Sequence, residues 1–181
     1  MRWAALLRAI NAGVKLPMPE LRTFLTDQGM RDVSTLLASG NAIFDADEND
    51  GAALEARLQS AMRHDLGIET GWFLRSHAEL NAVVAADPFP DAAVSRPNLL
   101  LVYFCREAVD PAQVDALATS FDGPERLKAV GRELYIDHVV NVGRSRLPQA
   151  MAKARLAVSA TARNWNTVRK LADLTARLPA G

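Results

Sequence analysis

The alternation of apolar and polar positions predicts the first elements of the chain. A short apolar run over Arg2–Leu7 is typical of a strand, and Pro17–Gly29 has apolar residues at helical spacing and ends at a glycine. The segment Asp32–Ala46 is typical of two strands that fold over Ser39 and Gly40, a dipeptide that favours a tight turn. We therefore expect a strand, a helix and a β-hairpin in that order.

Three further elements complete the first half of the chain. Gly51–Leu66 has apolar residues at helical spacing, Gly71–Ser76 is typical of a strand, and His77–Ala86 is typical of a short helix. The first half is thus predicted to be βαββαβ. This order matches the split βαβ, or ferredoxin-like, motif, in which an antiparallel sheet has helices on one face.

A second half follows the segment Asp87–Pro97, which contains three prolines and no apolar periodicity. Its expected elements are a strand over 98–105, a helix over 111–121, a hairpin over 126–139 that turns at Gly131 and Arg132, and two closing helices. We predict an α+β fold of two ferredoxin-like (βαββαβ-type) halves with antiparallel sheets and an extra C-terminal helix. The expected domains are 1–90 and 97–181, with one compact unit as the alternative.

Composition narrows the class of protein. The 181 residues, 49% of them hydrophobic, are enough to bury a core in one or two small domains. The only cysteine, Cys105, excludes an internal disulfide and fits a reducing cytoplasm. The apolar stretch between Arg2 and Arg8 is too short for a secretory core or a membrane span. We therefore expect a cytoplasmic protein without a membrane partner.

Charge is unevenly distributed along the chain, although the net charge is zero. Residues 45–125 hold fifteen acids and five bases, a net charge of −10, whereas residues 139–181 hold eight bases and one acid, a net charge of +7. This asymmetry fits an anionic ligand at the basic end, and it fits equally well two complementary faces that meet inside the fold.

The segment Thr161–Leu178 begins TARNWNTVRKL, which places two asparagines, poor helix formers, in a helical pattern. We predict one helix with Arg163, Asn166 and Lys170 on the face opposite its apolar arc. Arg163 would lie in the first turn, where the helix dipole disfavours a cation unless an anion is near. Asn164 would fall in the apolar arc and need a hydrogen-bond partner. A solvated basic face with a structural asparagine is the alternative.

A second basic stretch, NVGRSRLPQAM, begins at Asn141. Ser145 is a candidate N-cap for the helix that follows, and the free amides there would form an anion pocket together with Arg144 and Arg146. No complete phosphate-loop pattern is present, so a flexible basic loop with an ordinary cap is the alternative.

The loop after the first strand offers Arg8, Asn11 and Lys15 as binding groups, because strand ends and the loops that follow commonly carry function. Neither GxxxxGK[ST] nor GxGxxG occurs there, which argues against a nucleotide-binding loop. Ser39 and Asn41 of the SGN turn add two polar groups, although the hairpin turn alone accounts for them.

Catalytic and metal-binding groups cannot be chosen from the sequence. His64, His77 and His138 lack the spacing of metal ligands, so we expect no metal site and no cofactor. Cys105 lies in an apolar run and is more typical of a small core residue than of a nucleophile. No acid, base and nucleophile can be assigned, so the sequence leaves open whether the protein is an enzyme.

Four separated motifs, LLRAINAG, LASGNAIF, VGRELYI with VGRSRL, and TARNWNTVRKL, together resemble the bacterial family designated domain of unknown function 1697. The resemblance implies a compact α+β protein of two ferredoxin-like halves and brings no established activity. Members typically carry RGIN-V-GG-KN in the first loop. This chain has Ala9, Val14 and Leu16 where that pattern offers glycine, glycine and asparagine, and it has Ala38 where the family usually has a glutamine before SGN.

These replacements restrict close backbone approach to the first loop. They favour a site built on Arg144, Arg146 and the last helix over one built on the first loop.

The leading hypothesis is the binding of a small anionic, phosphate-bearing ligand by basic and amide side chains. Two alternatives remain, a nucleic-acid-binding protein and a protein-interaction or oligomerisation module without catalysis. The first alternative is weakened by an aromatic content of only 6%. The candidate ligand-binding residues are Arg8, Asn11, Lys15, Ser39, Asn41, Arg144, Arg146, Arg163, Asn166 and Lys170.

Overall fold

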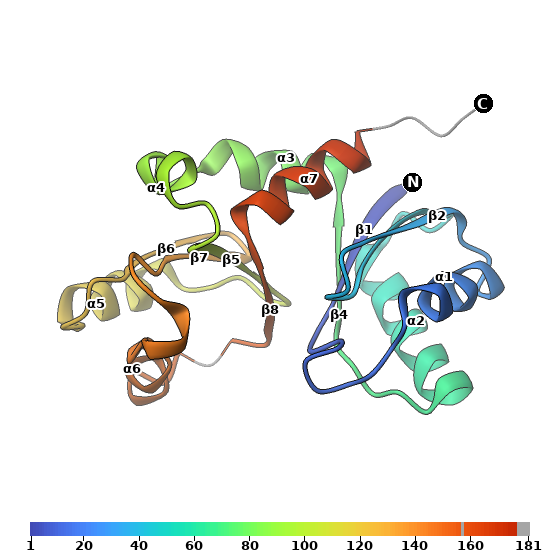
Figure 1. Ribbon diagram of the computed structural model, residues 1–181, viewed down its shortest axis with the longest axis horizontal. Helices are drawn as coiled ribbons and strands as arrows, with labels where there is room; N and C mark the ends of the chain where they lie inside the picture. The colour runs from blue at the N-terminus through green and yellow to red at the C-terminus, as the bar shows by residue number, and fades with distance from the viewer. Residues whose placement is uncertain (157, 177–181) are drawn as a thin grey trace. The chain divides into compact units, whose positions relative to one another are not determined.

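The computed structural model describes residues 1–156 and 158–176. It divides the chain into two units, the first being Met1–Ala82 with the segment that begins at Lys170, and the second being Val83–Arg169. Each unit contains a four-stranded antiparallel sheet with α-helices packed against it (Figure 1). The predicted α+β class is therefore confirmed.

The first unit has the βαββαβ order that the sequence predicts. Its sheet has the strand order β2-β3-β1-β4, so consecutive elements along the chain are not all neighbours in the sheet. Helix α3 follows β4, and its residues from Val83 on belong to the second unit. The elements are β1 (Arg2–Leu7), α1 (Met18–Asp27), β2 (Arg31–Leu36), β3 (Asn41–Asp45), α2 (Gly51–Leu66), β4 (Trp72–Ser76) and α3 (His77–Ala86).

Helix α2 begins and ends where its flanking residues dictate. The Asp50 carboxylate accepts hydrogen bonds from the amides of Ala52, at 2.9 Å, and Ala53, which satisfies two free donors of the first turn. Gly67 ends the helix in the left-handed region, with φ of 66°. The buried side of α2, with that of α1, packs on one face of the sheet to form a core that includes Trp3, Phe44 and Trp72.

The second unit repeats this arrangement. Its strand order is β6-β7-β5-β8, and helices α5 and α6 share a core with one face of the sheet. Helix α7 follows β8 directly, and its residues from Lys170 on belong to the first unit. The elements are α4 (Pro90–Ser95), β5 (Leu100–Cys105), α5 (Pro111–Ser120), β6 (Arg126–Val130), β7 (Glu133–Asp137), the 3-10 helix η1 (Val142–Arg144), α6 (Leu147–Lys153), β8 (Ala160–Asn164) and α7 (Trp165–Thr175).

Two details of the second unit differ from the prediction. Helix α4 lies in the proline-rich segment that showed no apolar periodicity, and it begins at Pro90, a residue suited to the first helical turn. The prediction of two consecutive closing helices is wrong, because strand β8 lies between α6 and α7.

Strand β8 also corrects the prediction of one helix from Thr161 to Leu178. Residues 160–164 pair with β5, with Arg163 opposite Val102, so Arg163 lies in a strand and not in a first helical turn. Asn164 caps α7 instead of lying within its apolar arc, because its side-chain oxygen accepts the Thr167 amide at 3.0 Å. Leu178 lies outside the described residues.

Removal of the Asn164 cap is expected to have a modest effect on stability. Asn164→Ala should lower the free energy of unfolding by about 1 kcal/mol, the usual cost of a lost N-cap. Urea unfolding monitored by circular dichroism measures the change. Asn49→Ala, at an exposed asparagine, is the matched control and should change stability by less than about 0.5 kcal/mol. Equal losses in both variants would argue against the cap.

Candidate functional site

The loop between β1 and α1 has a fixed backbone conformation. Its first amide, that of Arg8, donates to the Gly71 carbonyl at 2.9 Å. Ala9 and Asn11 both lie in the left-handed region, with φ of 56° and 55°. Glycine adopts this region without a Cβ penalty, and an alanine there costs about 1 kcal/mol. The left-handed backbone at Ala9 is thus a physical reason for the glycine that the family pattern offers at this position.

The amides of this loop bond to the loop itself. Ala12, Gly13 and Val14 all donate to the Ala9 carbonyl, at 3.2, 3.0 and 3.1 Å, and the Asn11 amide donates to the Val14 carbonyl at 2.6 Å. An anion-binding nest needs amides that point at the ligand. These four amides are already used, so any recognition of an anion here depends on side chains.

Asn11 holds the loop in place. Its side-chain nitrogen donates to the carbonyls of Leu16, at 3.2 Å, and Ala38, at 2.6 Å, and its oxygen accepts the Leu16 amide at 3.2 Å. A backbone bond from Leu7 to the Gly40 carbonyl, at 2.8 Å, joins the same two segments. The loop and the hairpin turn over residues 37–40, which are separate motifs in the sequence, therefore form one surface, the loop–turn surface.

The asparagine of the SGN turn is also structural. Asn41 is fully buried, and its side-chain nitrogen donates to the Leu36 carbonyl at 2.8 Å and to the Ser39 hydroxyl at 3.0 Å. Ser39 itself is exposed beside the loop. The predicted hairpin over Ser39 and Gly40 is confirmed, and Asn41 stabilises it from within.

Two cations border this surface. Arg8 and Lys15 are both exposed, and within the described part of the chain neither side chain forms an ion pair or a hydrogen bond. Lys15 lines a hollow of about 220 Å³ together with Asn11, Gly13 and Val14. The loop–turn surface thus combines a backbone held by hydrogen bonds with two positive charges that no acid of the described residues neutralises.

Among the described residues, the predicted basic loop of the second unit has fewer unpaired basic side chains than the loop–turn surface. Arg144 is exposed in η1, whereas Arg146 donates to the Asp122 carbonyl at 2.7 Å. The N-cap of α6 is Arg146 and not the predicted Ser145, although the Ser145 hydroxyl accepts the Leu147 amide at 3.1 Å just before the helix. Helix α6 has only seven residues, so its dipole offers an anion little.

The remaining basic and amide candidates lie apart from that loop. Arg163 is buried in β8, where its guanidinium donates to the Thr161 hydroxyl at 2.9 Å and the Ala162 carbonyl at 2.8 Å. Burial lowers the pKa of Arg163 to about 10, so it keeps its charge at neutral pH. Asn166 is exposed at the start of α7 and donates to the Asn98 side chain at 3.0 Å.

The structure therefore distributes the ten candidate residues over two units. Five of them form the loop–turn surface of the first unit, and the exposed Lys170, on α7, belongs to that unit as well. The other four lie on separate elements of the second unit. Arg8, Asn11, Lys15 and Ser39 are exposed on this surface, and Asn41 is buried beneath it at the start of β3.

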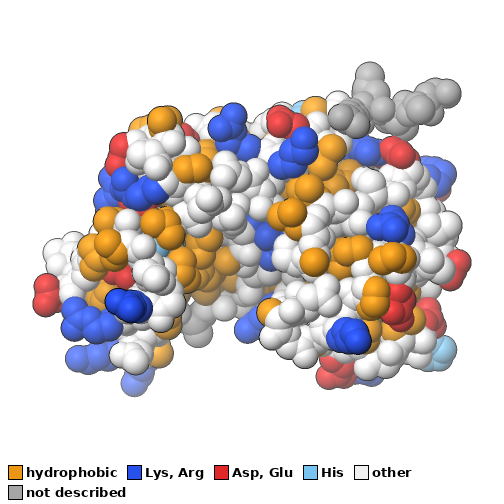
Figure 2. Space-filling view, in the orientation of Figure 1, with side chains coloured by type: hydrophobic (Ala, Val, Ile, Leu, Met, Phe, Trp, Pro, Cys, Tyr) orange, Lys and Arg blue, Asp and Glu red, His pale blue; other side chains and the backbone are white. Residues whose placement is uncertain are grey.

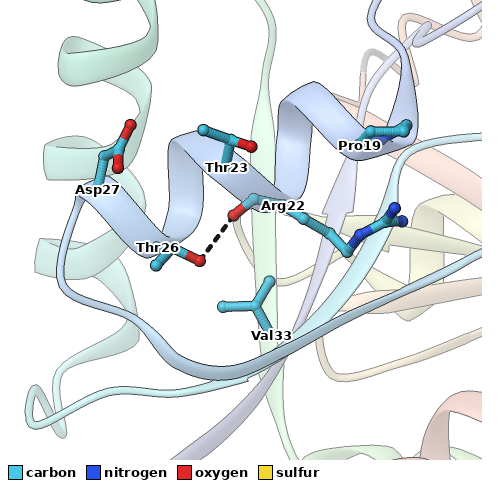
Figure 3. Close-up of a pocket in the computed structure, with 6 residues that line it drawn as sticks. All are labelled: Pro19, Arg22, Thr23, Thr26, Asp27 and Val33. Atoms are coloured by element: carbon cyan, nitrogen blue, oxygen red, sulfur yellow. Dashed lines mark hydrogen bonds between the residues drawn. The ribbon is translucent and has the colours of Figure 1, made fainter.

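A larger hollow, about 470 Å³, lies between α1 and β2 of the first unit (Figure 3). Its polar groups are partly used, since Arg22 donates to the Thr35 hydroxyl at 2.8 Å and Thr26 donates to the Arg22 carbonyl at 3.0 Å. Asp27 adds a negative charge. This hollow suits an anion less well than the loop–turn surface does. Its lining is Pro19, Arg22, Thr23, Thr26, Asp27 and Val33.

An ion-pair cluster in the second unit was missed by the sequence analysis. The fully buried carboxylate of Asp137 accepts two hydrogen bonds from Arg96, at 2.9 and 2.6 Å, and two from Arg126, at 2.9 and 2.7 Å. Asp91 bonds to both arginines. Burial alone would raise the pKa of Asp137, but the hydrogen bonds from the two arginines outweigh it and lower that pKa.

The positions of two charged residues in the predicted hairpin could have indicated this cluster. Arg126 opens β6 and Asp137 closes β7, the two strands of the hairpin, and the register places them opposite each other. The balanced charges make the cluster a structural element and not a site for a charged ligand.

The described residues meet neither the requirements of a metal site nor those of a membrane-spanning helix. In 1–156 and 158–176, no three His, Cys, Asp or Glu side chains are grouped so as to hold a metal ion. Cys105 is buried. No helix in the same residues has both the length and the apolar character needed to cross a membrane.

The fold and the site define a class, namely an α+β protein with two four-stranded antiparallel sheets and a hydrogen-bonded basic loop after the first strand. The chain belongs to the DUF1697 family, described as a protein of unknown function, whose model matches residues 1–135. A solved structure of a conserved bacterial protein from Streptococcus pneumoniae is 24% identical, with a TM-score of 0.74 over 97% of this chain and 98% of that chain. At this identity the likeness concerns the fold alone. No curated protein matches the sequence.

Proposed function

We propose that the protein binds a small anionic ligand, such as a phosphate-bearing metabolite, at the loop–turn surface. The observation that carries this proposal is the hydrogen bond from Asn11 to the Ala38 carbonyl, which joins two separate sequence motifs beside Arg8 and Lys15. Charged groups held on a fixed backbone bind with less loss of conformational entropy than groups on a mobile loop.

The two cations and the two asparagines have different roles in this proposal. Arg8 offers a planar fork that matches two oxygens of a phosphate or carboxylate, and Lys15 supplies a compact positive charge beside the hollow. Asn11 and Asn41 keep the loop and the turn in register and do not orient the ligand, because their amide nitrogens already bond to the protein.

Isothermal titration calorimetry with inorganic pyrophosphate tests the proposal. A charge-assisted hydrogen bond contributes about 1.5 to 3 kcal/mol, so Arg8→Ala and Lys15→Ala should each raise Kd about tenfold or more. Lys153→Ala removes an exposed lysine of α6 and should leave Kd unchanged.

The basic loop of the second unit supplies the decisive comparison. Arg144→Ala combined with Arg146→Ala should also leave Kd unchanged. A loss of affinity in that double variant but not in Arg8→Ala would move the site to the second unit. Absence of pyrophosphate binding by the unaltered protein at millimolar concentration would refute the proposal.

No specific observation favours either alternative function, nucleic-acid binding or protein interaction. The aromatic residues on strands of the first sheet are all buried and offer no stacking platform to a nucleic acid; they are Trp3, Phe44, Trp72 and Phe73. On the face drawn in Figure 2, basic side chains lie singly or in small groups among acidic and apolar ones. Such a surface does not favour the backbone of a nucleic acid, which is best bound by a continuous basic stripe.

We further infer that both units are ferredoxin-like and that the protein is cytoplasmic. The ferredoxin-like assignment is supported by the βαββαβ order in each unit and by sheets in which the fourth strand lies beside the first.

The cytoplasmic location is supported by the single, free cysteine.

A further inference from the structure

His138, the residue after β7, is buried without a polar partner for its side chain. Its amide donates to the Leu99 carbonyl at 3.0 Å, but neither ring nitrogen has a hydrogen-bond partner, and the residue is only 2% exposed. Because side chains alternate along a strand, His138 lies on the same face as Leu134 and Ile136, which belong to the core. A buried imidazole without a hydrogen-bond partner destabilises the folded state.

Glu125 occupies the matching position beside β6. The register pairs Arg126 with Asp137, so one step further Glu125 lies opposite His138 on the same face of the sheet. Glu125 is 9% exposed. One of its oxygens accepts a hydrogen bond from the Ser145 hydroxyl, and the other has no partner. A buried acid and a buried base thus face each other without a hydrogen bond between them.

The chain that follows His138, Val139–Arg146, is tied back to this pair and is here named the latch segment. Ser145 is its tie, because the hydroxyl donates to Glu125 and also accepts the Leu147 amide. Val139 begins the segment in the left-handed region, with φ of 57°. Val140 is 68% exposed. Two side-chain bonds therefore tie the end of the latch segment to the unit, that of Ser145 to Glu125 and that of Arg146 to the Asp122 carbonyl, and only the first involves the buried pair.

The charges that face His138 are few. Glu125 faces it from the start of β6 and Asp137 precedes it on β7, and both raise its pKa, whereas burial has the larger effect and lowers it. Asp137 is itself held by two arginines, which reduces its attraction for an imidazolium. The latch segment carries no acid and adds only Arg144 and Arg146. His138 is therefore neutral at pH 7. Of these acids, only Glu125 is not already paired with an arginine and could act as a counter-ion to the imidazolium.

We propose that the latch segment is an acid-sensitive switch, closed over neutral His138 and released when His138 takes up a proton. The imidazolium needs a polar partner, and in the closed state no hydrogen bond joins its ring to Glu125. Water reaches the ring when the segment opens. Opening breaks the bond from Ser145 to Glu125 and moves the two arginines that flank Ser145. The switch does not depend on anion binding at the loop–turn surface.

The sign of the effect follows from the position of the pKa. The pKa of His138 in the folded protein lies below the ordinary value of 6.5, so the open state binds the proton more tightly than the closed state does. The closed state is fully favoured above pH 6.5 and loses free energy as the pH falls towards the folded-state pKa. Each pH unit between the two pKa values corresponds to roughly a tenfold change in the opening equilibrium.

Amide hydrogen exchange measured by NMR tests the switch. Protection factors, which remove the intrinsic pH dependence of exchange, should fall several-fold for Gly143, Ser145 and Leu147 between pH 7.5 and pH 5.5, and those of β5 should not. His138→Gln should abolish this difference. His64→Gln, at an exposed histidine, should retain it.

Two further measurements need no variant at His138. The imidazole signal of His138 in the unaltered protein should titrate below pH 6.5, and titration at or above this value would overturn the proposal. Ser145→Ala should lower the protection of the latch segment at both pH values. Protection factors that are the same at pH 7.5 and 5.5, or a full acid response in His138→Gln, would also overturn it.

Discussion

Asp137→Asn is expected to lower the free energy of unfolding by about 3 kcal/mol, the low end of the cost of breaking a buried ion pair. The carboxylate is fully buried and receives four hydrogen bonds from Arg96 and Arg126. The amide that replaces it accepts fewer of these bonds and leaves two guanidinium groups without a buried counter-charge. The low end of the range applies because the Arg126 side chain is 40% exposed and partly screened by water.

Urea unfolding at pH 7 measures this loss, and Asp115→Asn is the matched control. Asp115 pairs with Lys128 at 3.1 Å, but its side chain is 55% exposed, so the same substitution should cost less than about 1 kcal/mol. If the two variants lost stability equally, the buried cluster would have no special role.

The pH dependence of stability gives an independent check on Asp137. Its pKa in the folded protein is lowered below the ordinary value of 3.8. The ion-paired carboxylate therefore contributes its full stabilisation above pH 3.8, and this contribution is lost as the pH falls through the folded-state pKa. The difference in urea midpoint between the unaltered protein and Asp137→Asn should shrink between pH 4 and pH 2.

Gly40→Ala is expected to cost about 3 kcal/mol, combining overpacking with a left-handed backbone. A Cβ on Gly40 would lie 2.8 Å from the Ile10 Cβ and 3.1 Å from the Leu7 Cβ, and the φ of Gly40 is 75°. The change pushes the hairpin turn away from the first loop, so anion binding at the loop–turn surface should weaken as well.

Gly29→Ala separates the two causes. Gly29 also has a left-handed backbone, with φ of 82°, but a Cβ there would meet no atom within 4 Å. Its replacement should cost only about 1 kcal/mol. Thermal unfolding of both variants measures the difference, and equal costs would show that the close approach of Gly40 to Ile10 is unimportant.

The elements that the sequence predicts correctly are those with a local signal. The first strand, Arg2–Leu7, and the helix Gly51–Leu66 have the predicted bounds, and the hairpin around Gly131 and Arg132 is confirmed. Period-two and period-3.6 patterns reflect which face of an element is buried, and turn residues reflect the backbone angles they allow. Both kinds of information lie within a few neighbouring residues.

Strand β8 shows where local reasoning fails. Thr161–Asn164 continues a helical pattern without a glycine or proline, yet it is a strand because it pairs with β5, about sixty residues earlier in the chain. One local signal was present, since asparagine is a preferred N-cap, and Asn164 marks the true start of the last helix.

By itself the sequence determined the α+β class, the order of most elements and the family, because these depend on patterns of neighbouring residues. Only the tertiary structure decided which polar groups meet. It joined Asn11 to Ala38, buried Arg163 in a strand, and placed Asp137 between two arginines and His138 opposite Glu125. Such contacts depend on distances between residues far apart in the chain, and the strength of a hydrogen bond or ion pair depends on those distances and on burial from water.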